Sequence, residues 1–389
     1  MSATRGPSVL LVGAQVRGDR ASTMARFARI FHEGMSARGI TVEFQPSPVF
    51  WGAKAFAEGG GISFGELVMS FLDFPRKLRL RATRARASRR PWVAHIADQT
   101  HAFYAKALEA LPVVVTCHDL LAARAARGEF REVRVGWAER LFHRMVLAGL
   151  RRANCVACVS ETTAGDVRRL AGIDPSRVRV IHSGLNHPYR PMERDEAQAR
   201  AAALLPAGWS RPPGRLLLHV GHSGWYKNRH GIIRILAELC RLDPASNWRL
   251  ALVGRAPTEQ LETLAHEQGV DDRMASLVNV ADEDLRGLYC AADALLFPSL
   301  AEGFGWPIIE AQSCGCPVIT SARAPMTEVA GDAALFVDPA DPPAAARAIL
   351  EGWEGLGRSR ALGPENARRF STDSMLDRYA ELYRELATP

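Results

Sequence analysis

Short apolar runs rich in β-branched residues recur along this chain, and each ends in a polar or glycine-containing segment. Because neighbouring positions within a run are both apolar, the pattern is typical of strands buried on both faces of a parallel sheet. In the first half of the chain the runs occupy residues 8–13, 42–44, 92–98, 113–119, 155–160 and 178–184. In the second half they occupy residues 215–221, 249–254, 276–280, 294–299, 317–321 and 335–339.

Between the strands of the second half, apolar residues three and four positions apart predict helices. These segments are 231–242, 258–269, 282–292 and 306–315. Strands that alternate with helices form parallel sheets through right-handed crossovers. Two successive sets therefore predict an α/β protein with two doubly wound, Rossmann-like domains, each open at the carboxyl ends of its strands.

The polar, proline-rich stretch 186–214 separates the two sets, and its interior near 193–205 has a helical pattern. We therefore place a first domain at 1–190 and a second at 191–370. The remaining segment, 371–389, is amphipathic and predicts a helix that can pack on either domain, including back on the first. A chain of 389 residues is too long for one ordinary core, which agrees with two domains.

The composition is that of a globular protein with anionic partners. Hydrophobic residues make up 47% and charged residues 23%, and 49 basic against 42 acidic residues give a net charge of +7. This balance favours nucleotides, phospholipid surfaces or nucleic acid as partners. The first apolar run is too short for a signal peptide or a membrane span, so we expect a cytoplasmic protein whose membrane contact is peripheral.

The cysteines give no pattern of a disulfide framework. They number seven, and most lie in apolar runs: Cys117, Cys155, Cys158, Cys240, Cys290, Cys314 and Cys316. We expect buried free thiols in a reducing compartment. Cys155 and Cys158 have the spacing of a metal-ligand pair, but alternation along a strand directs them to opposite faces. We therefore predict no metal site.

The stretch AEGFGWPIIE at 301–310 places two acids around glycine, aromatic and proline residues. Pro307 suits the first turn of a helix, where its missing N–H group costs nothing. We therefore expect a helix that begins near Trp306 or Pro307. Glu302 would lie in the loop before that helix, and Glu310 in its first turn.

A helix N-terminus with unpaired N–H groups, here those of 304–308, is a site for anions. A carboxylate does not bind phosphate but accepts hydrogen bonds from sugar hydroxyls. Gly303 and Gly305 permit close approach of the backbone to a ligand. Together these features favour a ligand with a diphosphate and hydroxyl groups, which is a nucleotide sugar. The alternative is that Glu310 interacts only with the helix dipole.

Residues 298–339, PSLAEGFGWPIIEAQSCGCPVITSARAPMTEVAGDAALFVDP, resemble the donor-binding signature of retaining glycosyltransferases of the GT-B fold in family four. That family has two glutamates separated by seven residues, as Glu302 and Glu310 are. The second glutamate is followed by an alanine and a small-residue turn, here Ala311 and Gly315. Weaker resemblance extends from about residue 92 to 339. The resemblance implies two Rossmann-like domains that face each other across a cleft, the second of which binds the donor.

The resemblance also implies a role for each matching residue. Glu310 would bind the ribose hydroxyls, Glu302 would lie near the donor sugar, and Lys227 would bind the diphosphate and stabilise the leaving group. The backbone positions expected to hold sugar hydroxyls, ribose or phosphates are Gly303, Phe304, Gly305, Ile308 and Ile309.

One departure from the family concerns the second cation. The family has an arginine shortly before its lysine, whereas this chain has HSGWY at 222–226. Arg229, two residues after Lys227, is our candidate for its replacement on the donor. His118, at the end of a strand, matches a family histidine beside the sugar, with a purely structural histidine as the alternative. Gly13, at the end of the first strand, is a further candidate for donor contact.

The chemistry implied by the resemblance is transfer with retention at the anomeric carbon. Such a transfer needs stabilisation of the departing diphosphate more than it needs a strong base, and that phosphate can itself take the proton of the acceptor. The family is generally metal-independent. The acids of DEDL at 282–285 are expected to begin a helix, where their charge suits the dipole. We therefore predict neither a metal nor another cofactor.

The stretch 74–90 is rich in arginine and contains no acid. We interpret it as a helix that contacts anionic lipid head groups at the inner membrane, with a solvated basic arm as the alternative. No nucleic-acid module accompanies the charge, so nucleic acid is not an expected partner. The preceding stretch 56–74 is glycine-rich and then apolar, and is a candidate acceptor or membrane element.

The sequence thus predicts a retaining hexosyltransferase that moves mannose, glucose or a similar hexose from a UDP- or GDP-sugar. The acceptor would be a glycan or a lipid-linked molecule in bacterial polysaccharide or glycolipid assembly. Two alternatives stay open. One is a non-catalytic nucleotide-sugar-binding protein, which the departure at 222–226 favours. The other is a different nucleotide-sugar enzyme on the same fold, such as an epimerase or a hydrolase.

Overall fold

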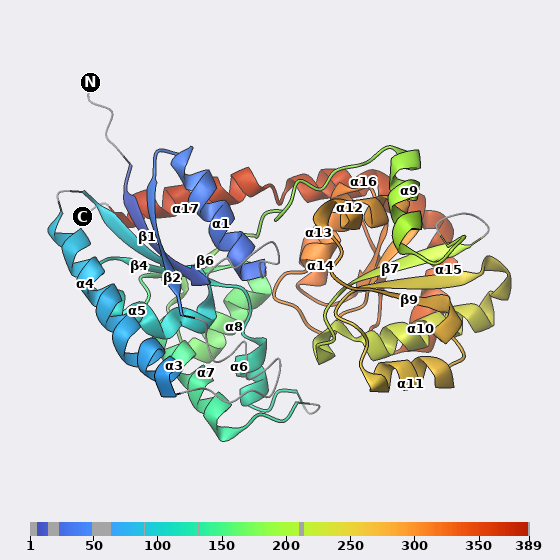
Figure 1. Ribbon diagram of the computed structural model, residues 1–389, viewed down its shortest axis with the longest axis horizontal. Coiled ribbons are helices and arrows are strands. Elements are labelled where there is room, and N and C mark those ends of the chain that lie inside the picture. The colour runs from blue at the N-terminus through green and yellow to red at the C-terminus, as the bar shows by residue number, and fades with distance from the viewer. Residues whose placement is uncertain are drawn as a thin grey trace. The chain divides into compact units, whose positions relative to one another are not determined.

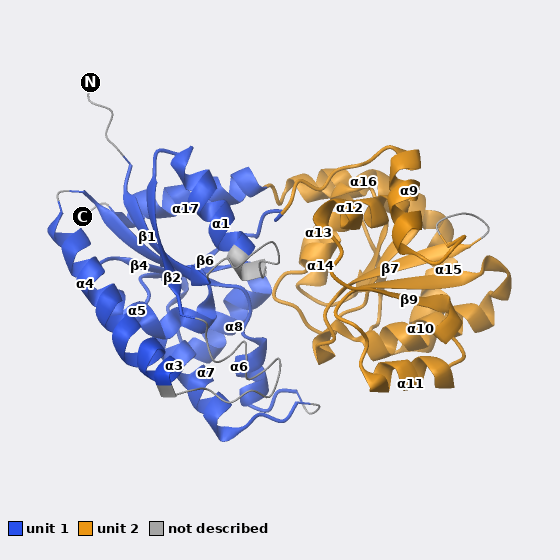
Figure 2. Ribbon diagram, viewed as in Figure 1, with its two compact units in different colours: residues 1–186, 372–389 blue, residues 187–371 orange. Residues whose placement is uncertain are grey.

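The computed structural model describes residues 6–14, 23–48, 64–88, 90–130, 133–209 and 214–387. The chain forms two compact units, shown in Figure 2. Unit 1 comprises Met1–Asn186 and Thr372–Pro389, and unit 2 comprises His187–Ser371. Each unit is built on one six-stranded sheet between layers of helices (Figure 1), as the alternation of apolar runs and helical segments predicts.

The sheet of unit 1 is entirely parallel and has the order β2-β1-β3-β4-β5-β6. β1 lies between β2 and β3, so Val9 is opposite Val42 on one side and Val93 on the other. The strands are β1 Ser8–Ala14, β2 Thr41–Ser47, β3 Trp92–Ile96, β4 Val113–Cys117, β5 Cys155–Cys158 and β6 Val178–Val180.

Helices cover both faces of this sheet. The α-helices are α1 Thr23–Ser36, α3 Phe64–Val68, α4 Phe74–Ala87, α5 Ala105–Leu108, α6 Leu121–Ala126, α7 Trp137–Leu150, α8 Glu161–Ala171 and α17 Thr372–Ala387. The π-helical turn η1 Met69–Asp73 joins α3 to α4, and the 3₁₀ turns are η2 Gln99–Tyr104 and η3 Pro175–Arg177. The predicted basic helix is thus α4, although Arg89 and residues 56–63 of the neighbouring prediction lie outside the described residues.

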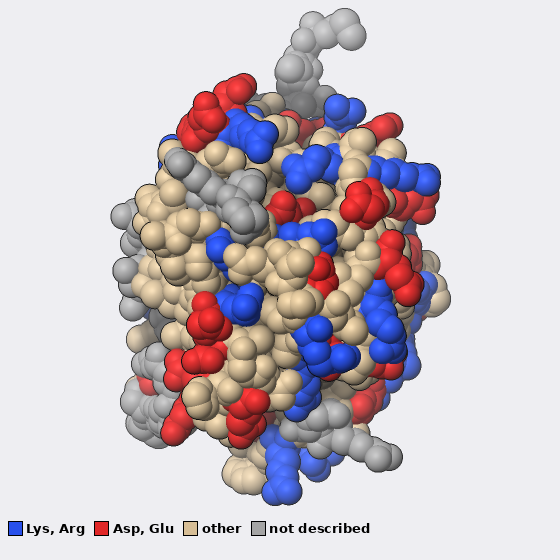
Figure 3. All heavy atoms as spheres, turned by 90° about the vertical axis from the view of Figure 1, so that its right-hand side faces the viewer, with Lys and Arg blue, Asp and Glu red and all other residues tan. Residues whose placement is uncertain are grey.

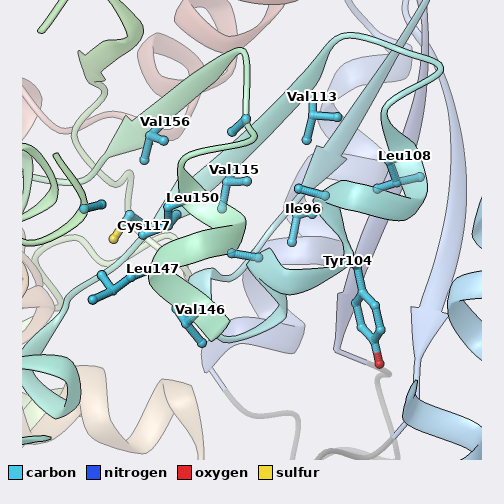
Figure 4. Close-up of a cluster of buried hydrophobic side chains, with 14 of the residues drawn as sticks. Ile96, Tyr104, Leu108, Val113, Val115, Cys117, Val146, Leu147, Leu150 and Val156 are labelled. Carbon is cyan, nitrogen blue, oxygen red and sulfur yellow. The ribbon is translucent and has the colours of Figure 1, made fainter. Parts of the chain in front are cut away.

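Two cores lie on opposite faces of the unit 1 sheet because alternate residues of each strand point in opposite directions. Leu10 packs in one core, part of which Figure 4 shows, whereas Leu11 packs in the other, against α1 and α17. The same alternation separates Cys158 from Cys155. The expected separation of this cysteine pair onto two faces is therefore confirmed.

The sheet of unit 2 is also parallel, with the order β12-β11-β10-β7-β8-β9. Its strands are β7 Arg215–Gly221, β8 Trp248–Gly254, β9 Met274–Leu277, β10 Ala294–Phe297, β11 Val318–Ser321 and β12 Leu335–Val337. Its helices are α9 Arg194–Leu204, α10 Arg229–Leu242, α11 Glu259–Glu267, α12 Asp282–Ala291, α13 Trp306–Ser313, α14 Met326–Ala330, α15 Pro342–Gly352 and α16 Leu356–Arg368. Short 3₁₀ turns are η4 Trp225–Lys227, η5 Pro244–Ser246, η6 Asp271–Arg273 and η7 Trp353–Gly355.

The position of one strand was predicted wrongly. The sequence pattern favours a strand at 276–280, whereas β9 ends at Leu277. Asn279 has a left-handed backbone with φ of 56°, and Val278 is 50% exposed. A left-handed residue cannot continue a strand, so the apolar residues 278 and 280 belong to the loop that follows.

The C-terminal helix α17 is fixed to the sheet of unit 1 by a buried polar chain. Tyr383 Oη lies 2.7 Å from His95 Nδ1, and Tyr379 Oη lies 2.7 Å from Thr116 Oγ1. His95 Nε2 closes the chain at 2.8 Å from Thr116 Oγ1. Burial lowers the pKa of His95 to about 3, so its ring is neutral at physiological pH. These partners are separated by more than two hundred residues in sequence, so the chain specifies where α17 docks.

Replacement of Tyr383 by Phe should reduce the free energy of unfolding by about 1–3 kcal/mol, because His95 Nδ1 then loses its partner inside the core. Denaturant titration measures this change. Glu381→Gln, an exposed substitution on the same helix, is the control and should stay within about 0.5 kcal/mol of wild type. Equal stability of the two variants would show that the polar chain does not anchor α17.

Candidate functional site

The order of strands in unit 2 creates a topological switch point in its sheet, between β7 and β10. From β7 the chain continues to β8 and β9 on one side, and from β10 to β11 and β12 on the other. The connections after β7 and β10 therefore diverge, which leaves an opening at the carboxyl ends of these two strands. The two strands pair directly, with Leu217 opposite Ala294. Lys227 follows β7 and Glu302 follows β10, so both predicted residues lie after the two strands at this switch point.

Lys227 and Glu302 form a buried ion pair, with Nζ 2.8 Å from Oε1 and side chains 11% and 8% exposed. The ammonium group also lies 4.7 Å from the centroid of the Phe297 ring. The two loops are joined by the backbone as well, since the N–H group of Leu300 donates to Tyr226 O at 2.8 Å. Two charges kept out of water at this position must compensate each other, so each depends on the other for its place.

Asn228 fixes the loop that carries Lys227. Its backbone is left-handed with φ of 57°, and its carboxamide oxygen accepts from the N–H group of Gly231 to cap α10. Its amide nitrogen donates to Pro298 O at 3.0 Å and Pro339 O at 2.8 Å. One side chain therefore ties the β7 loop to the loops after β10 and β12.

His222 begins the segment 222–226, which precedes Lys227 and contains no arginine. Its Nδ1 accepts from the N–H group of Gly224 at 2.9 Å, so Nε2 carries the proton and faces Tyr226 Oη at 2.7 Å. Burial, followed by the charges of Lys227, Arg255 and Arg229, lowers the pKa of His222 to about 4. The side chain is consequently neutral at physiological pH and shapes the loop without adding a charge.

Arg229 is 2% exposed and braces the ends of β7 and β8. Its guanidinium donates to Gly221 O at 2.7 Å, Arg255 O at 2.7 Å and Ser223 Oγ at 3.0 Å. Burial lowers its pKa, and no carboxylate lies within ion-pair distance among the described residues. These hydrogen bonds of Arg229 were not predicted from the sequence. A buried cation without an acidic partner makes this edge of the sheet electropositive.

Helix α13 begins at Trp306, as predicted from Pro307. Gly305 precedes it with φ of 107°, a left-handed conformation that favours glycine. The N–H group of Ile308 donates to Gly305 O at 3.0 Å. That group is therefore occupied within the protein, which corrects the expectation that all N–H groups of 304–308 are unpaired. The Ile308 and Ile309 side chains are fully buried, so only their backbone can approach a ligand.

Glu310 lies in the second turn of α13 rather than in its first, because the helix already begins four residues earlier. Its carboxylate is almost fully buried, and Oε2 accepts a hydrogen bond from Tyr289 Oη at 2.8 Å. Burial, followed by the Glu310 charge, raises the pKa of Tyr289 well above its usual value, so the phenol keeps its proton. A carboxylate five residues into a helix is too far from the end for a simple dipole role.

Tyr289 is the site residue that sequence reasoning missed. It lies on α12, which begins with Asp282, Glu283 and Asp284 in its first turn as predicted. The Tyr289 ring is fully buried in the structure, and a buried tyrosine needs a partner for its hydroxyl group. Only the packing of α12 beside α13 identifies Glu310 as that partner.

Gly303 and Phe304, in the loop before α13, can offer only their backbone to a ligand. Phe304 is 3% exposed, and its ring meets that of Phe370 edge-on with centroids 5.5 Å apart. Its side chain therefore belongs to the core, and Gly303 beside it is half-buried. This arrangement holds the loop rigidly before α13. Their predicted contact with sugar hydroxyls stays a prediction.

Two predicted residues lie in unit 1. His118 follows β4, and its Nε2–H donates to Ala97 O at 3.0 Å, while burial lowers its pKa. Gly13 lies within β1, and a Cβ atom there would lie 3.4 Å from the Cβ atoms of Ala28 and Ala97, which is an ordinary contact distance. Gly13 O also accepts from Ser47 Oγ at 3.0 Å. The donor roles of both residues stay predictions.

Comparison with known proteins covers both units. Residues 210–368 match the family model described as glycosyl transferases group 1. Residues 24–187 match the model described as glycosyltransferase family 4. The chain belongs to the group 1, family four glycosyltransferases. The resemblance carried by residues 298–339 is therefore confirmed.

Two relatives illustrate the range of this glycosyltransferase family. D-inositol 3-phosphate glycosyltransferase of Corynebacterium efficiens is 27% identical over 72% of this chain and 66% of its own length. O-antigen chain mannosyltransferase B of Escherichia coli is 28% identical over 70% of each chain. This chain spans 54–66% of the length of these inositol-phosphate enzymes.

A solved structure shows the same architecture. The crystal structure of Anabaena Alr3699/HepE in complex with UDP and glucose superposes with a TM-score of 0.72 over 98% of this glycosyltransferase and 100% of HepE. The sequences are 18% identical, so the likeness concerns the fold. The predicted GT-B fold is thus confirmed by the two parallel sheets and by this match.

Replacement of Lys227 by Met should lower the free energy of unfolding by about 3–5 kcal/mol, because the Glu302 carboxylate is left buried without its partner. The double variant Lys227→Met/Glu302→Gln should recover part of this loss. Denaturant unfolding of both variants measures the difference. Arg241→Met, which breaks an exposed pair on α10, is the control and should cost at most about 1 kcal/mol. A single variant as stable as this control would contradict the coupling.

Proposed function

We propose that this glycosyltransferase is a retaining hexosyltransferase that moves mannose, glucose or a similar hexose from a UDP- or GDP-sugar. Its acceptor would be a glycan or a lipid-linked molecule in bacterial polysaccharide or glycolipid assembly. The observation that carries the proposal is the buried Lys227–Glu302 pair, which lies at the switch point of the unit 2 sheet. Tyr289 and Glu310, on neighbouring helices, add a second buried polar pair to this unit.

The diphosphate of the donor would lie against Lys227 and the N-terminal end of α13. A lysine ammonium and oriented N–H groups stabilise the charge that builds on a departing phosphate. Arg229 would contribute through its buried charge, since three of its contacts are already made within the protein. Because the Lys227 ammonium is held in place by Glu302, it needs little reorganisation when the bond to the sugar breaks.

The ribose would be held by Glu310. Tyr289 Oη donates to one oxygen of this carboxylate and fixes its orientation. A carboxylate accepts several hydrogen bonds, which suits it to hydroxyl donors. We assign Tyr289 as a positioning residue for the donor, since it acts through Glu310.

Retention follows from attack by the acceptor on the face that the diphosphate leaves. An oxocarbenium-like centre forms, the departing phosphate takes the acceptor proton, and Glu302 stabilises the positive charge without forming a covalent bond. We keep His118 as a candidate beside the sugar. Its ring is neutral and its Nε2 proton is engaged by Ala97 O, so it would act by position rather than by proton transfer.

Names of similar proteins support the hexose and the nucleotide. One relative is a mannosyltransferase of an O-antigen chain, and the HepE structure contains UDP and glucose. An anionic membrane surface is the further partner that we propose, through the stretch 74–90. The solvent side of α4 carries basic residues such as Arg76, Lys77 and Arg79, while Phe74 and Leu78 are buried.

Nucleotide-dependent thermal stability tests the donor site. At about 100 times its dissociation constant, the correct nucleoside diphosphate should add about 2.7 kcal/mol to the stability of the wild type. UDP, GDP, ADP, TDP and CDP are compared on the wild type, Glu310→Ala and Tyr289→Phe. We expect one base to stabilise selectively, with the effect lost in Glu310→Ala and reduced in Tyr289→Phe. If no nucleotide shifts the transition, the donor site is assigned wrongly.

Turnover separates the proposal from its rivals. With radiolabelled donor and acceptor, the product should keep the anomeric configuration of the donor, and Lys227→Ala should lower kcat by about 10²–10³-fold. Proton NMR of the new linkage reads the configuration. Donor turnover that needs no acceptor would favour an epimerase or hydrolase. Tight nucleotide binding without any turnover would favour a non-catalytic binding protein.

A further inference from the structure

Helix α7 of unit 1 exposes large apolar side chains that its fold does not require. Trp137 is 81% exposed, which makes it the most exposed large apolar side chain in the described part of the chain. Leu141, four residues later and thus on the same face, is 51% exposed. The buried face of α7 is formed by other residues, including Phe142 and Val146. The exposed pair therefore does not stabilise the core.

A pocket of about 500 Å³ lies between α6 and α7 on the same unit. Three arginines line it, Arg127, Arg140 and Arg144, together with His143 and small apolar side chains. Among the described residues, none of those that line the pocket is acidic. Three cations around one concave surface form a site for an anion with several oxygens, of which a phosphate is the common example.

The arginines of this pocket are available to a ligand. Arg127 donates to Leu170 O at 2.9 Å, whereas the side chains of Arg140 and Arg144 have no hydrogen-bond or ion-pair partner among the described residues. Glu139 lies beside the pocket, with its Oε1 3.9 Å from His143 Nε2. Burial raises the pKa of Glu139 and lowers that of His143 to about 4, so His143 is neutral at physiological pH.

A second set of exposed apolar residues lies on η1 of unit 1. Met69 and Leu72 are 53% and 65% exposed. The ring of Phe71 between them stacks on Phe103 at 5.6 Å, and Phe103 lies 6.2 Å from Phe142 on the buried face of α7. These rings therefore pack η1, which follows α3, beside α7 (Figure 1).

The surface of α7 differs in its charge pattern from the face of the molecule shown in Figure 3. On that face, basic and acidic side chains are interspersed. At α7, cations alternate with exposed apolar residues along one helix. Trp137 and Arg144 are seven residues apart, or about 10 Å along the helix axis. That distance matches the depth of the head-group region, in which tryptophan prefers to lie.

We propose that the α6–α7 pocket binds the phosphate of an anionic phospholipid head group while Trp137 and Leu141 enter the bilayer interface. A free phosphate would use the arginines but not the apolar pair, and a single-stranded nucleic acid would stack on Trp137 but gain nothing from Leu141. The inference deepens the membrane partner proposed above by adding a phosphate contact at α7 to the basic surface of 74–90. It does not depend on the transfer reaction.

Vesicle sedimentation with the full-length protein tests the pocket. Vesicles of phosphatidylcholine with 30% phosphatidylglycerol are compared with pure phosphatidylcholine at about 0.1 M salt. R140Q/R144Q should lower partitioning onto the anionic vesicles about thirty-fold, which corresponds to the loss of two arginines at the surface. R347Q/R358Q removes the same charge from exposed positions of unit 2 and should change partitioning by no more than about threefold.

The variant W137S/L141S tests the exposed apolar pair. It should weaken binding to vesicles. Its binding of inorganic phosphate, measured by calorimetry, should stay unchanged. R76Q/R79Q tests the stretch 74–90 separately. Equal loss in R140Q/R144Q and R347Q/R358Q would overturn the pocket, as would a loss confined to R76Q/R79Q. Binding of inorganic phosphate or single-stranded RNA that depends on Arg140 and Arg144, without vesicle binding, would also overturn it.

Stabilisation by nucleoside diphosphates is measured on the same four variants. We expect it to equal that of the wild type, because all the substituted residues lie outside the donor site of unit 2. Loss of vesicle binding with normal nucleotide binding supports the pocket. Normal vesicle binding with no nucleotide response would reject the proposed donor site and leave the membrane site standing.

Discussion

The direct pairing of β7 with β10 is the constraint on which the site in unit 2 depends. Each strand is buried on both faces, so helices must cover the sheet and only its carboxyl edge stays open. Because successive connections run in opposite directions from these two strands, their following loops meet at that edge. Lys227 and Glu302, which are distant in sequence, become an ion pair with 2.8 Å between charged atoms.

The buried charge of Lys227 depends on the residues that surround it. Asn228 fixes the loop that carries Lys227, and Arg229 ties the ends of β7 and β8 together through carbonyl oxygens. Partial burial, followed by the charges of three neighbouring cations, lowers the pKa of His222, so its ring stays neutral. The result is a rigid positive edge with one compensating acid. Such an edge suits a reaction in which negative charge grows on a departing phosphate.

Unit 1 uses buried polarity for a different purpose. The chain of Tyr383, His95, Thr116 and Tyr379 is fully buried, and it determines which surface the C-terminal helix covers. Apolar packing alone would tolerate a shift of α17 along the sheet, whereas unpaired hydroxyl groups would not. On α7 the same unit shows the opposite arrangement. There, apolar side chains are exposed and arginines line a pocket, which indicates a surface shaped for contact rather than for stability.

The sequence by itself determined the type of each repeating element, because two-sided burial and helical periodicity are visible within a few residues. It also determined the start of α13 from Pro307, and the placement of Lys227 and Glu302 after strands. It failed at β9, where the left-handed Asn279 ends a run that looks extended. The tertiary structure decided the rest: the Tyr289–Glu310 bond, the carbonyl contacts of Arg229 and the docking of α17. Each of these joins residues whose proximity depends on strand order and helix packing, and no local pattern encodes that order.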